Sequence, residues 1–236
     1  TEGARAMYAE RYPEKPASNW SVIENGFDDE NFRDAESGFD RKPIGQPGQL
    51  TLIHSGILYP QERNPRPFFA ALRALKDSGE IGPARLQVVL RATGSDHIYR
   101  PMLTELNLTD IVKLAPTANY REALREMLVA DGLLLFQASI CNHQVPAKLY
   151  EYLRAGRPIF TLTDPIGNTA DVLRAAEAMD IVNIADADDI TVGLRHFLGR
   201  LQDGSATGAR REIANLHSRR SRTRELARLL DQIAIE

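Results

Sequence analysis

Short apolar runs alternate with helical patterns along the middle of the chain. The apolar runs cover residues 50–56, 85–94, 110–116, 132–139, 158–164 and 180–184. Between them, apolar residues recur at spacings of three and four, as in Phe68, Leu72 and Leu75, and this is the period of an amphipathic helix. Strands made of apolar runs are buried on both faces, as in parallel sheets. The pattern therefore predicts a doubly wound α/β fold with right-handed crossovers.

The helices expected between and after these strands complete the central unit. They cover approximately residues 64–79, 96–106, 119–131, 146–156, 168–178 and 188–201. Taken together, the elements predict a Rossmann-like parallel sheet of about six strands flanked by helices. We expect this unit to occupy residues 21–202.

The two ends of the chain lie outside this alternation. Residues 1–20 contain a predicted helix and a linker, and residues 203–236 contain a predicted C-terminal helical extension that runs from about Arg210 to Ile233. Within the extension, residues 217–225 have no apolar face. They fit a segment that spans a gap to another domain, a basic contact with a membrane surface, or a solvated helix face. Because the chain begins without Met, we expect it to be a piece of a longer protein.

Composition narrows the function classes. Hydrophobic residues make up 43% of the sequence, which is ample for a core, and the net charge of −3 argues against a nucleic-acid partner. Cys141 is the single cysteine, so an internal disulfide is excluded and a reducing, cytoplasmic location is expected. No apolar run approaches the ~20 residues that span a bilayer. The segment after the first strand lacks the glycine pattern of dinucleotide-binding proteins, and no Walker motif is present.

The segment 145–160, VPAKLYEYLRAGRPIF, predicts a loop, a short helix and a buried strand. Pro146 suits the first turn of the helix and Gly156 its left-handed end. Lys148 and Glu151 are three residues apart on one face, close enough to serve one ligand. A cation and a carboxylate in the first turns of a helix form a seat for a phosphorylated, sugar-like ligand. A surface ion pair explains the same spacing equally well.

A second cation precedes the first helix of the central unit. Arg63 stands immediately before the Asn64–Pro65 helix start, where free backbone N–H groups and the helix dipole favour anions. A guanidinium adds a forked donor suited to phosphate oxygens. Two cationic helix starts, at Arg63 and Lys148, flank one crevice and suit a diphosphate. Taken alone, Arg63 fits a solvated surface arginine as well.

Ligands of doubly wound sheets bind beyond the carboxyl ends of the strands. The loops at this edge supply further candidate contacts for a nucleotide-sugar ligand: Gly56, Thr93, Gly94, Ala115, Gln144 and Val145. Thr93, Gly94 and the backbone around Ala115 are candidates for the base and ribose, and ordinary turn chemistry explains these residues equally well. The loop 164–169, DPIGNT, could contact the sugar or diphosphate through backbone N–H groups.

Four segments, in chain order, resemble motifs of one enzyme family. They are SVIENGFDDENF (21–32), HSGILYPQERNP (54–65), YREALREMLVADGLLLF (120–136) and VPAKLYEYLRAGRPIF (145–160). The corresponding family motifs read viPNGvD…F, GxlxxxKg, lxxyyxxADvxllp and P.KxxEymaaGkPvv. On these motifs the chain resembles the C-terminal, donor-binding half of a GT-B glycosyltransferase, of the retaining, glycogen-synthase-like type often called family four.

The resemblance implies roles for matching residues. Glu151 matches the second glutamate of a paired-glutamate motif and is implied to accept hydrogen bonds from the ribose hydroxyls. The first glutamate is replaced by His143, which is expected near the donor sugar as a catalytic residue, or is an exposed loop histidine. The arginine expected after Gly56 is absent, because Ile57 follows. We therefore expect Arg63, supplemented by Lys148, to stabilise the leaving diphosphate as catalytic residues.

The function implied is transfer of a sugar from a nucleotide-diphosphate sugar with retention of configuration. No cofactor and no obligatory metal are expected, and the acidic runs 28–30 and 186–189 are interpreted as helix-start and loop acids. The implied partners are the donor, a missing N-terminal domain and a glycan or lipid-linked acceptor, the last of which allows a location at the inner face of a membrane. The fragment alone is expected to be inactive. Two alternatives remain: a nucleotide-sugar epimerase of the same architecture, and a non-catalytic nucleotide-sugar-binding module.

Overall fold

The computed structural model describes residues 1–235. Six strands form one parallel sheet in the order β3-β2-β1-β4-β5-β6. The strands are β1 (Leu50–Ser55), β2 (Leu86–Arg91), β3 (Val112–Ala115), β4 (Gly132–Gln137), β5 (Ile159–Thr163) and β6 (Ile181–Asn183). Every strand lies within an apolar run that the sequence marks, so the predicted parallel α/β sheet is confirmed.

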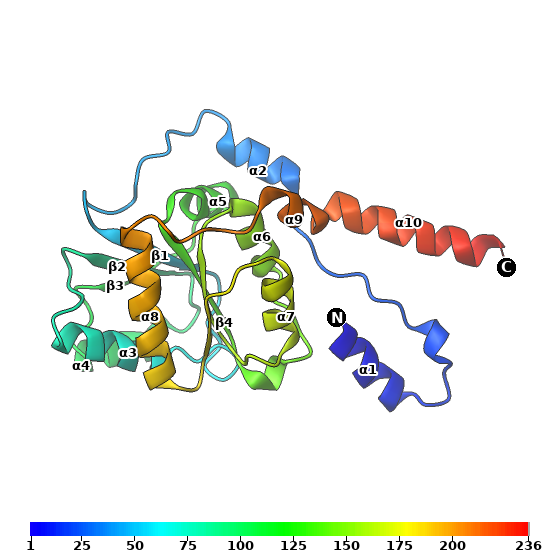
Figure 1. The fold of residues 1–236 in the computed structure, drawn as a ribbon, viewed down its shortest axis with the longest axis horizontal. Helices are drawn as coiled ribbons and strands as arrows, with labels where there is room; N and C mark the ends of the chain where they lie inside the picture. Colours follow the sequence, from blue (N-terminus) through cyan, green and yellow to red (C-terminus); the bar gives the residue numbers. More distant parts are fainter. Residues whose placement is uncertain (236) are drawn as a thin grey trace.

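Helices cover both faces of this sheet (Figure 1). One face carries α3 (Arg66–Asp77), α4 (Asp96–Glu105) and α8 (Ala187–Gln202). The other carries α5 (Tyr120–Val129), α6 (Lys148–Ala155) and α7 (Asn168–Ala175), together with α2 (Asp29–Glu36) and α9 (Arg211–Leu216). The 3-10 turns η1 (Ala17–Asn19) and η2 (Ser139–Cys141) lie in connecting segments. The change of face between α3 and α6 is what makes the fold doubly wound.

Two apolar cores, one on each face, explain the unbroken runs of the strands. Leu52 and Ile53 are adjacent on β1, yet Leu52 belongs to the core under α3 and Ile53 to the core under α5 and α6. All six residues of β4 are buried. A strand that must satisfy both cores has no polar face, and this is why the sequence shows runs instead of alternation.

Hydrogen bonds and turn residues near the helix ends set where the helices begin and end, and two helices begin two residues later than predicted. α3 begins at Arg66 and not at Asn64, because the Asn64 side chain accepts a hydrogen bond from the Arg66 N–H (3.1 Å) and forms a turn ahead of the helix. α6 begins at Lys148, and Pro146 lies in the turn that leads into it. Gly156 ends α6 with φ of 69°, as predicted for a left-handed cap.

The C-terminal extension is two helices, so the single helix predicted from about residue 210 to residue 233 is wrong. α9 ends at Leu216 and α10 (Arg219–Ile235) starts three residues later. Between them the backbone pairs with Phe27, whose N–H donates to the carbonyl of His217 (3.2 Å) and whose carbonyl accepts from the N–H of Arg219 (2.8 Å). A partner distant in sequence interrupts the helix there, and no local pattern reveals it.

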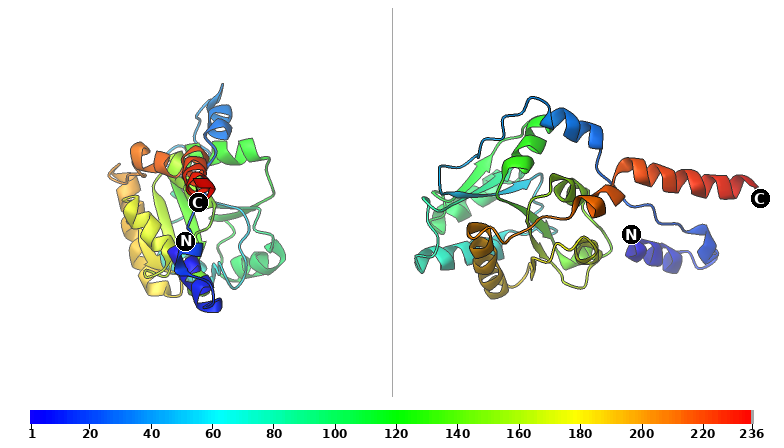
Figure 2. Two further views of the ribbon diagram at one scale, coloured as in Figure 1. Left: turned by 90° about the vertical axis from the view of Figure 1, so that its right-hand side faces the viewer. Right: turned by 45° about the horizontal axis from the view of Figure 1, so that its top comes forward.

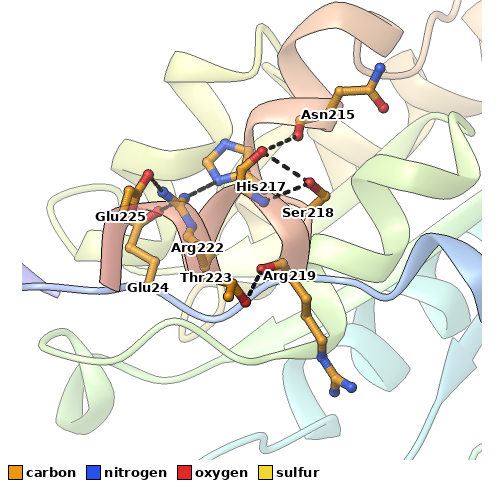
Figure 3. Close-up of polar contacts among 9 residues, drawn as sticks. Glu24, Asn215, His217, Ser218, Arg219, Arg222, Thr223 and Glu225 are labelled. Carbon is orange, nitrogen blue, oxygen red and sulfur yellow. Dashed lines mark hydrogen bonds and ion pairs between the residues drawn. The ribbon is translucent and has the colours of Figure 1, made fainter. Parts of the chain in front are cut away.

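Side chains reinforce this crossing of two segments, which we call the 27–218 bridge (Figure 3). Arg222 forms an ion pair with Glu24 and donates to Nδ1 of His217 (2.8 Å). Its other terminal nitrogen donates to Glu225 (2.8 Å). The bridge thus joins the chain just before α2 to the start of α10.

The two terminal helices, α1 (Glu2–Arg11) and α10, project from the same side of the sheet domain (Figures 1 and 2). On the α1 side, Tyr8 and Tyr12 stack on Trp20 with ring centroids 5.9 Å and 6.1 Å from it. Leu226, Leu230 and Ile233 of α10 are exposed. None of the helices in the described part of the chain is long and apolar enough to cross a membrane.

Replacing Gly26 by alanine tests the 27–218 bridge. A Cβ at residue 26 would lie 2.5 Å from the carbonyl oxygen of His217, so the two segments must separate. We expect the free energy of local opening to fall by about 1–3 kcal/mol. Amide hydrogen exchange of Phe27 and Arg219 should therefore be faster in the variant. Gly82→Ala is the control, because a Cβ there meets nothing within 4 Å; equal exchange in the two variants would contradict the tight crossing.

Candidate functional site

The candidate site lies at the carboxyl ends of β1 and β4, where the strand order reverses. The loop after β1 leads to α3 on one face, and the loop after β4 leads to α6 on the other. The two loops touch where the Ala138 N–H donates to the carbonyl of Glu62 (2.7 Å). Loops that part to opposite faces leave a crevice between them, which is where ligands of this fold class bind.

Lys148, at the start of α6, reaches across to the end of β1. Its Nζ lies 3.0 Å from Nε2 of His54. It also lies against the backbone of Gly56, since a Cβ there would be 2.8 Å from Nζ. Gly56 has φ of 114°, a conformation that favours glycine. A glycine at position 56 therefore supplies both the turn and the space for the amine.

His54 is a fully buried residue of β1 that the sequence did not single out. Its Nδ1 lies 2.9 Å from the carbonyl oxygen of Leu134, which can only accept, so Nδ1 carries the proton. Nε2 is then an acceptor and receives a hydrogen bond from Lys148. Burial, followed by the charges of Lys148 and Arg63, holds the pKa of His54 well below its usual range. The imidazole is therefore neutral.

The Lys148 amine sits in an environment that disfavours its charge. Burial is the main cause and the positive charge of Arg63 the second, while Glu151 opposes both. Together they lower the pKa of Lys148 to about 7. Near neutral pH the amine is thus balanced between its charged and uncharged forms, so an anion arriving beside it would favour the ammonium form.

Arg63 lies on the loop before α3, near Lys148. Its Nη1 donates to the carbonyl of Ile57 (3.0 Å), and its guanidinium carbon lies 5.2 Å from the centroid of the Tyr59 ring. Its Nε is buried and has no hydrogen-bond partner within residues 1–235. The structure thus brings together the two cations that the sequence predicted to flank one crevice.

Glu151 faces Tyr120, the first residue of α5. The Tyr120 hydroxyl donates to Oε1 of Glu151 (2.6 Å). Burial raises the pKa of Glu151, while this hydrogen bond and the charge of Lys148 act in the opposite direction. Within the described chain Glu151 has no ion pair with Lys148, so interpreting the two as a surface ion pair is wrong. Tyr120 belongs to the motif 120–136, but its helical pattern alone does not reveal the contact.

His143 lies in the loop between η2 and α6 and is partly exposed. Its carbonyl accepts a hydrogen bond from the hydroxyl of Thr1, and its Nε2 lies 3.3 Å from Nε2 of Gln144. α1 begins directly on this loop, because a Cβ on Gly3 would lie 3.2 Å from Cα of His143. The start of α1 and the predicted sugar-side histidine are therefore neighbours.

The loop 164–169 braces the His143 loop from the other side. Asn142 donates to Asp164 (2.7 Å), and the hydroxyl of Thr169 donates to the carbonyl of Gln144 (3.0 Å). The N–H groups of residues 166, 167 and 168 all donate to Asp164 or Asn142. Those N–H groups therefore already have partners, and the expectation that they contact a ligand is not supported.

The other predicted contact residues shape the same edge. Thr93 is buried, and its hydroxyl accepts from the N–H of Ser95 (3.2 Å). Gly94 is exposed with φ of 72°. Ala115 is buried and its carbonyl accepts from the N–H of Ala92 (2.9 Å), while Val145 packs partly buried on the core under α6. Of this group, Gly94 presents the most open backbone.

No metal centre can be assembled from the described residues, since they contain no group of three or more His, Cys, Asp or Glu side chains able to hold an ion. Of the two acidic runs, Asp28 caps α2 by accepting from the N–H of Glu30 (2.9 Å). Asp186 caps α8 by accepting from the N–H groups of Asp188 and Asp189 (both 3.0 Å). Their interpretation as helix-start acids is confirmed.

Known proteins resemble this chain in structure and not in sequence. The sequence matches no protein-family model and no curated protein. A glycosyltransferase from Rickettsia africae superposes with a TM-score of 0.72 at 13% identity, over 99% of this chain and 62% of its own. Sucrose-phosphate synthase from Thermosynechococcus elongatus gives 0.61 at 14% identity, over 96% and 56%. The pneumococcal O-GlcNAc transferase, solved with UDP and GlcNAc, gives 0.57 at 13% identity, over 100% and 44%.

These similarities show the fold. The chain spans between 44% and 62% of the length of these three structures. All three neighbours are named as sugar-transferring or sugar-phosphate-forming enzymes, and the chain shares the fold of the part that it covers. The GT-B glycosyltransferase fold expected from the four motifs is therefore confirmed.

A substitution on α6 tests how the Gly56 turn is held. The hydroxyl of Tyr152 is buried and accepts from the N–H of Ser55 (3.0 Å), so Tyr152→Phe leaves that N–H without a partner. We expect a loss of about 1–3 kcal/mol in the free energy of unfolding, measured by urea denaturation. Tyr150→Phe is the matched control, since the structure of residues 1–235 gives the buried Tyr150 no hydroxyl hydrogen bond. Equal stability of the two variants would show that the Tyr152 hydroxyl does not stabilise the turn through Ser55.

Proposed function

We propose that the chain binds a nucleoside diphosphate sugar at the carboxyl ends of β1 and β4, as the donor-binding part of a retaining glycosyltransferase. The observation that carries the proposal is that the side chains of Arg63, Lys148 and Glu151 lie close together at this edge of the sheet. Arg63 donates to the carbonyl of Ile57, the neighbour of Gly56, and the Lys148 amine lies against Gly56. Glu151 lies one turn further along α6. Two cations beside an oriented carboxylate match a diphosphate joined to a ribose.

The cations act on the leaving group. When the bond between sugar and diphosphate breaks, negative charge grows on the departing nucleoside diphosphate. Donors fixed in advance around that charge stabilise the transition state, and such contacts contribute several kcal/mol. Arg63 offers a fork of N–H donors, and Lys148 offers a compact charge beside Gly56. In this proposal the two side chains replace the charge that a divalent metal would supply.

The carboxylate acts on the nucleoside. Glu151 accepts hydrogen bonds from the two vicinal hydroxyls of a ribose, for which a carboxylate has enough acceptor sites. The Tyr120 hydroxyl already donates to Oε1 and fixes the carboxylate in one orientation. The base would then lie along the loops after β2 and β3, beside Gly94, with Thr93 and Ala115 supporting those loops from within.

The sugar would face the loop after β4, which carries His143, Gln144 and Val145. His143 can donate to a sugar hydroxyl or to a phosphate oxygen. Because the chain spans 44–62% of its structural neighbours, we assign the acceptor site, for a glycan or lipid-linked sugar, to a further domain. The 236-residue chain is accordingly expected to bind donor but to transfer no sugar, and measurable transfer by the chain alone would overturn this division.

A binding-only module is the second candidate. His143 occupies the position where the family motif has its first glutamate, so one carboxylate of that motif is absent. Turnover of any donor by the full-length protein would exclude this candidate. Product formed without an acceptor would instead identify the epimerase alternative.

Calorimetric titration with UDP and GDP tests the site. We expect Arg63→Gln and Glu151→Gln each to weaken binding of the preferred nucleotide at least tenfold, which is about 1.4 kcal/mol. The first variant removes a diphosphate donor and the second removes the charged ribose acceptor.

Arg195→Gln and Glu80→Gln are the matched controls. This exposed ion pair lines a cavity with Leu50, at the opposite end of β1. Both control variants should bind like the parent chain. The same affinity in all four variants would place the nucleotide elsewhere on the molecule.

A further inference from the structure

His54 is the first residue of the segment 54–65 and has been given no role so far, yet it makes the closest polar contact of Lys148. It is fully buried at the end of β1, and its ring packs edge-on against Phe136 with centroids 5.2 Å apart. Its two nitrogens are both engaged, Nδ1 with the carbonyl of Leu134 (2.9 Å) and Nε2 with Nζ of Lys148 (3.0 Å). Phe136, Leu134 and Lys148 thus hold the ring in one orientation. In that orientation Nε2, the acceptor nitrogen, faces the Lys148 amine.

We propose that His54 is the positioning residue for Lys148, and that its neutral ring holds the amine over Gly56 so that the amine binds a proton together with the diphosphate. This inference rests on the proposed function for the identity of the anion. The proton comes from solvent and adds to Nζ, so the amine gains one positive charge as the anionic phosphate oxygens arrive. No covalent bond between heavy atoms changes.

The surroundings of the amine explain why the proton arrives with the ligand. The groups that face it are His54 from β1, Arg63 from the loop before α3, and Glu151 on its own helix. Tyr152, also on α6, is held by the N–H of Ser55. A neutral imidazole brings no counter-charge, and Arg63 repels a second cation. A diphosphate supplies the missing negative charge and restores the ammonium form.

The pH dependence has a definite sign. Anion binding raises the pKa of Lys148 above its ligand-free value of about 7. The binding energy from the ammonium is therefore complete below pH 7 and is lost as pH rises above it. The phosphate oxygens are already ionised in this range, because their last pKa is about 6. The dissociation constant for UDP should rise roughly 15-fold between pH 7 and pH 8.5, with close to one proton taken up per UDP at pH 8.5.

Two substitutions distinguish the role of Nδ1 of His54 from the role of Nε2. In His54→Asn the amide can still donate to Leu134, but nothing accepts from Lys148. In His54→Gln the longer side chain can place its carbonyl oxygen near the position of Nε2. We expect the asparagine variant to bind UDP several-fold more weakly at pH 6.5 and to lose both the pH dependence and the proton uptake. The glutamine variant should recover them, and Lys148→Met should abolish proton uptake.

The ligand-free chain tests the pair independently of any nucleotide. With 15N-labelled lysine, the pKa of Lys148 is measured by NMR, and Lys15, Lys42, Lys76 and Lys113 serve as internal references. We expect a value near 7 in the parent chain, and in His54→Asn a rise toward the ~10.4 of a solvated lysine. A normal pKa in the parent chain, or an unchanged one in His54→Asn, would overturn the proposal. If the asparagine variant does not fold, the Lys148 pKa in the parent chain and in His54→Gln tests the proposal instead. If neither UDP nor GDP binds while the Lys148 pKa is low, the proposed function is refuted and the pairing of His54 with Lys148 stands.

Discussion

The parting of two loops at the centre of the sheet is the constraint on which the site depends. β1 and β4 are parallel neighbours, but α3 and α6 cover opposite faces. The two loops touch where Ala138 bonds to Glu62, and beyond that contact they lead to opposite faces of the sheet. Arg63 stands on the loop after β1, and Lys148 begins the helix that follows the loop after β4.

That geometry brings two positive groups close together in a poorly solvated place. A second positive charge beside the first is unfavourable there, so one of the two groups tends to lose its proton. Arg63 cannot do so, because a guanidinium stays charged throughout the physiological range. Lys148 can, and the neutral His54 ring accepts a hydrogen bond from it whether it is charged or not. Burial and the charge of Arg63 thus disfavour the charge on Lys148, and in the proposed function the diphosphate supplies the opposite charge.

Local patterns predicted the fold well, and they picked out some of the residues of the candidate site. The strands from Leu50 to Asn183 are recognisable because burial on both faces requires unbroken apolar runs. The end of α6 at Gly156 is recognisable because a left-handed turn favours glycine. Arg63, Lys148 and Glu151 stand at helix starts whose position relative to the sheet follows from topology.

What the sequence hid depends on contacts between distant positions. His54 and Lys148 are 94 residues apart, and Tyr120 and Glu151 are 31 apart. In the sequence, His54 is merely a polar residue within an apolar strand. The break between α9 and α10 depends on Phe27, far away along the chain. Such pairs have no period and no spacing rule, so they emerge only when the chain is folded.

The crossing of residues 24–27 with residues 217–222 also has a mechanical consequence. The segments that carry α1 and α10 are fastened to each other at this crossing by backbone hydrogen bonds and by the Arg222–Glu24 ion pair. The start of α1 is held a second time, where Thr1 and Gly3 bond to His143 and Asn168. Neither segment can swing independently without breaking that fastening. A displacement of α10 would therefore be passed to residues 24–27, while the start of α1 stays tied to the loop of His143.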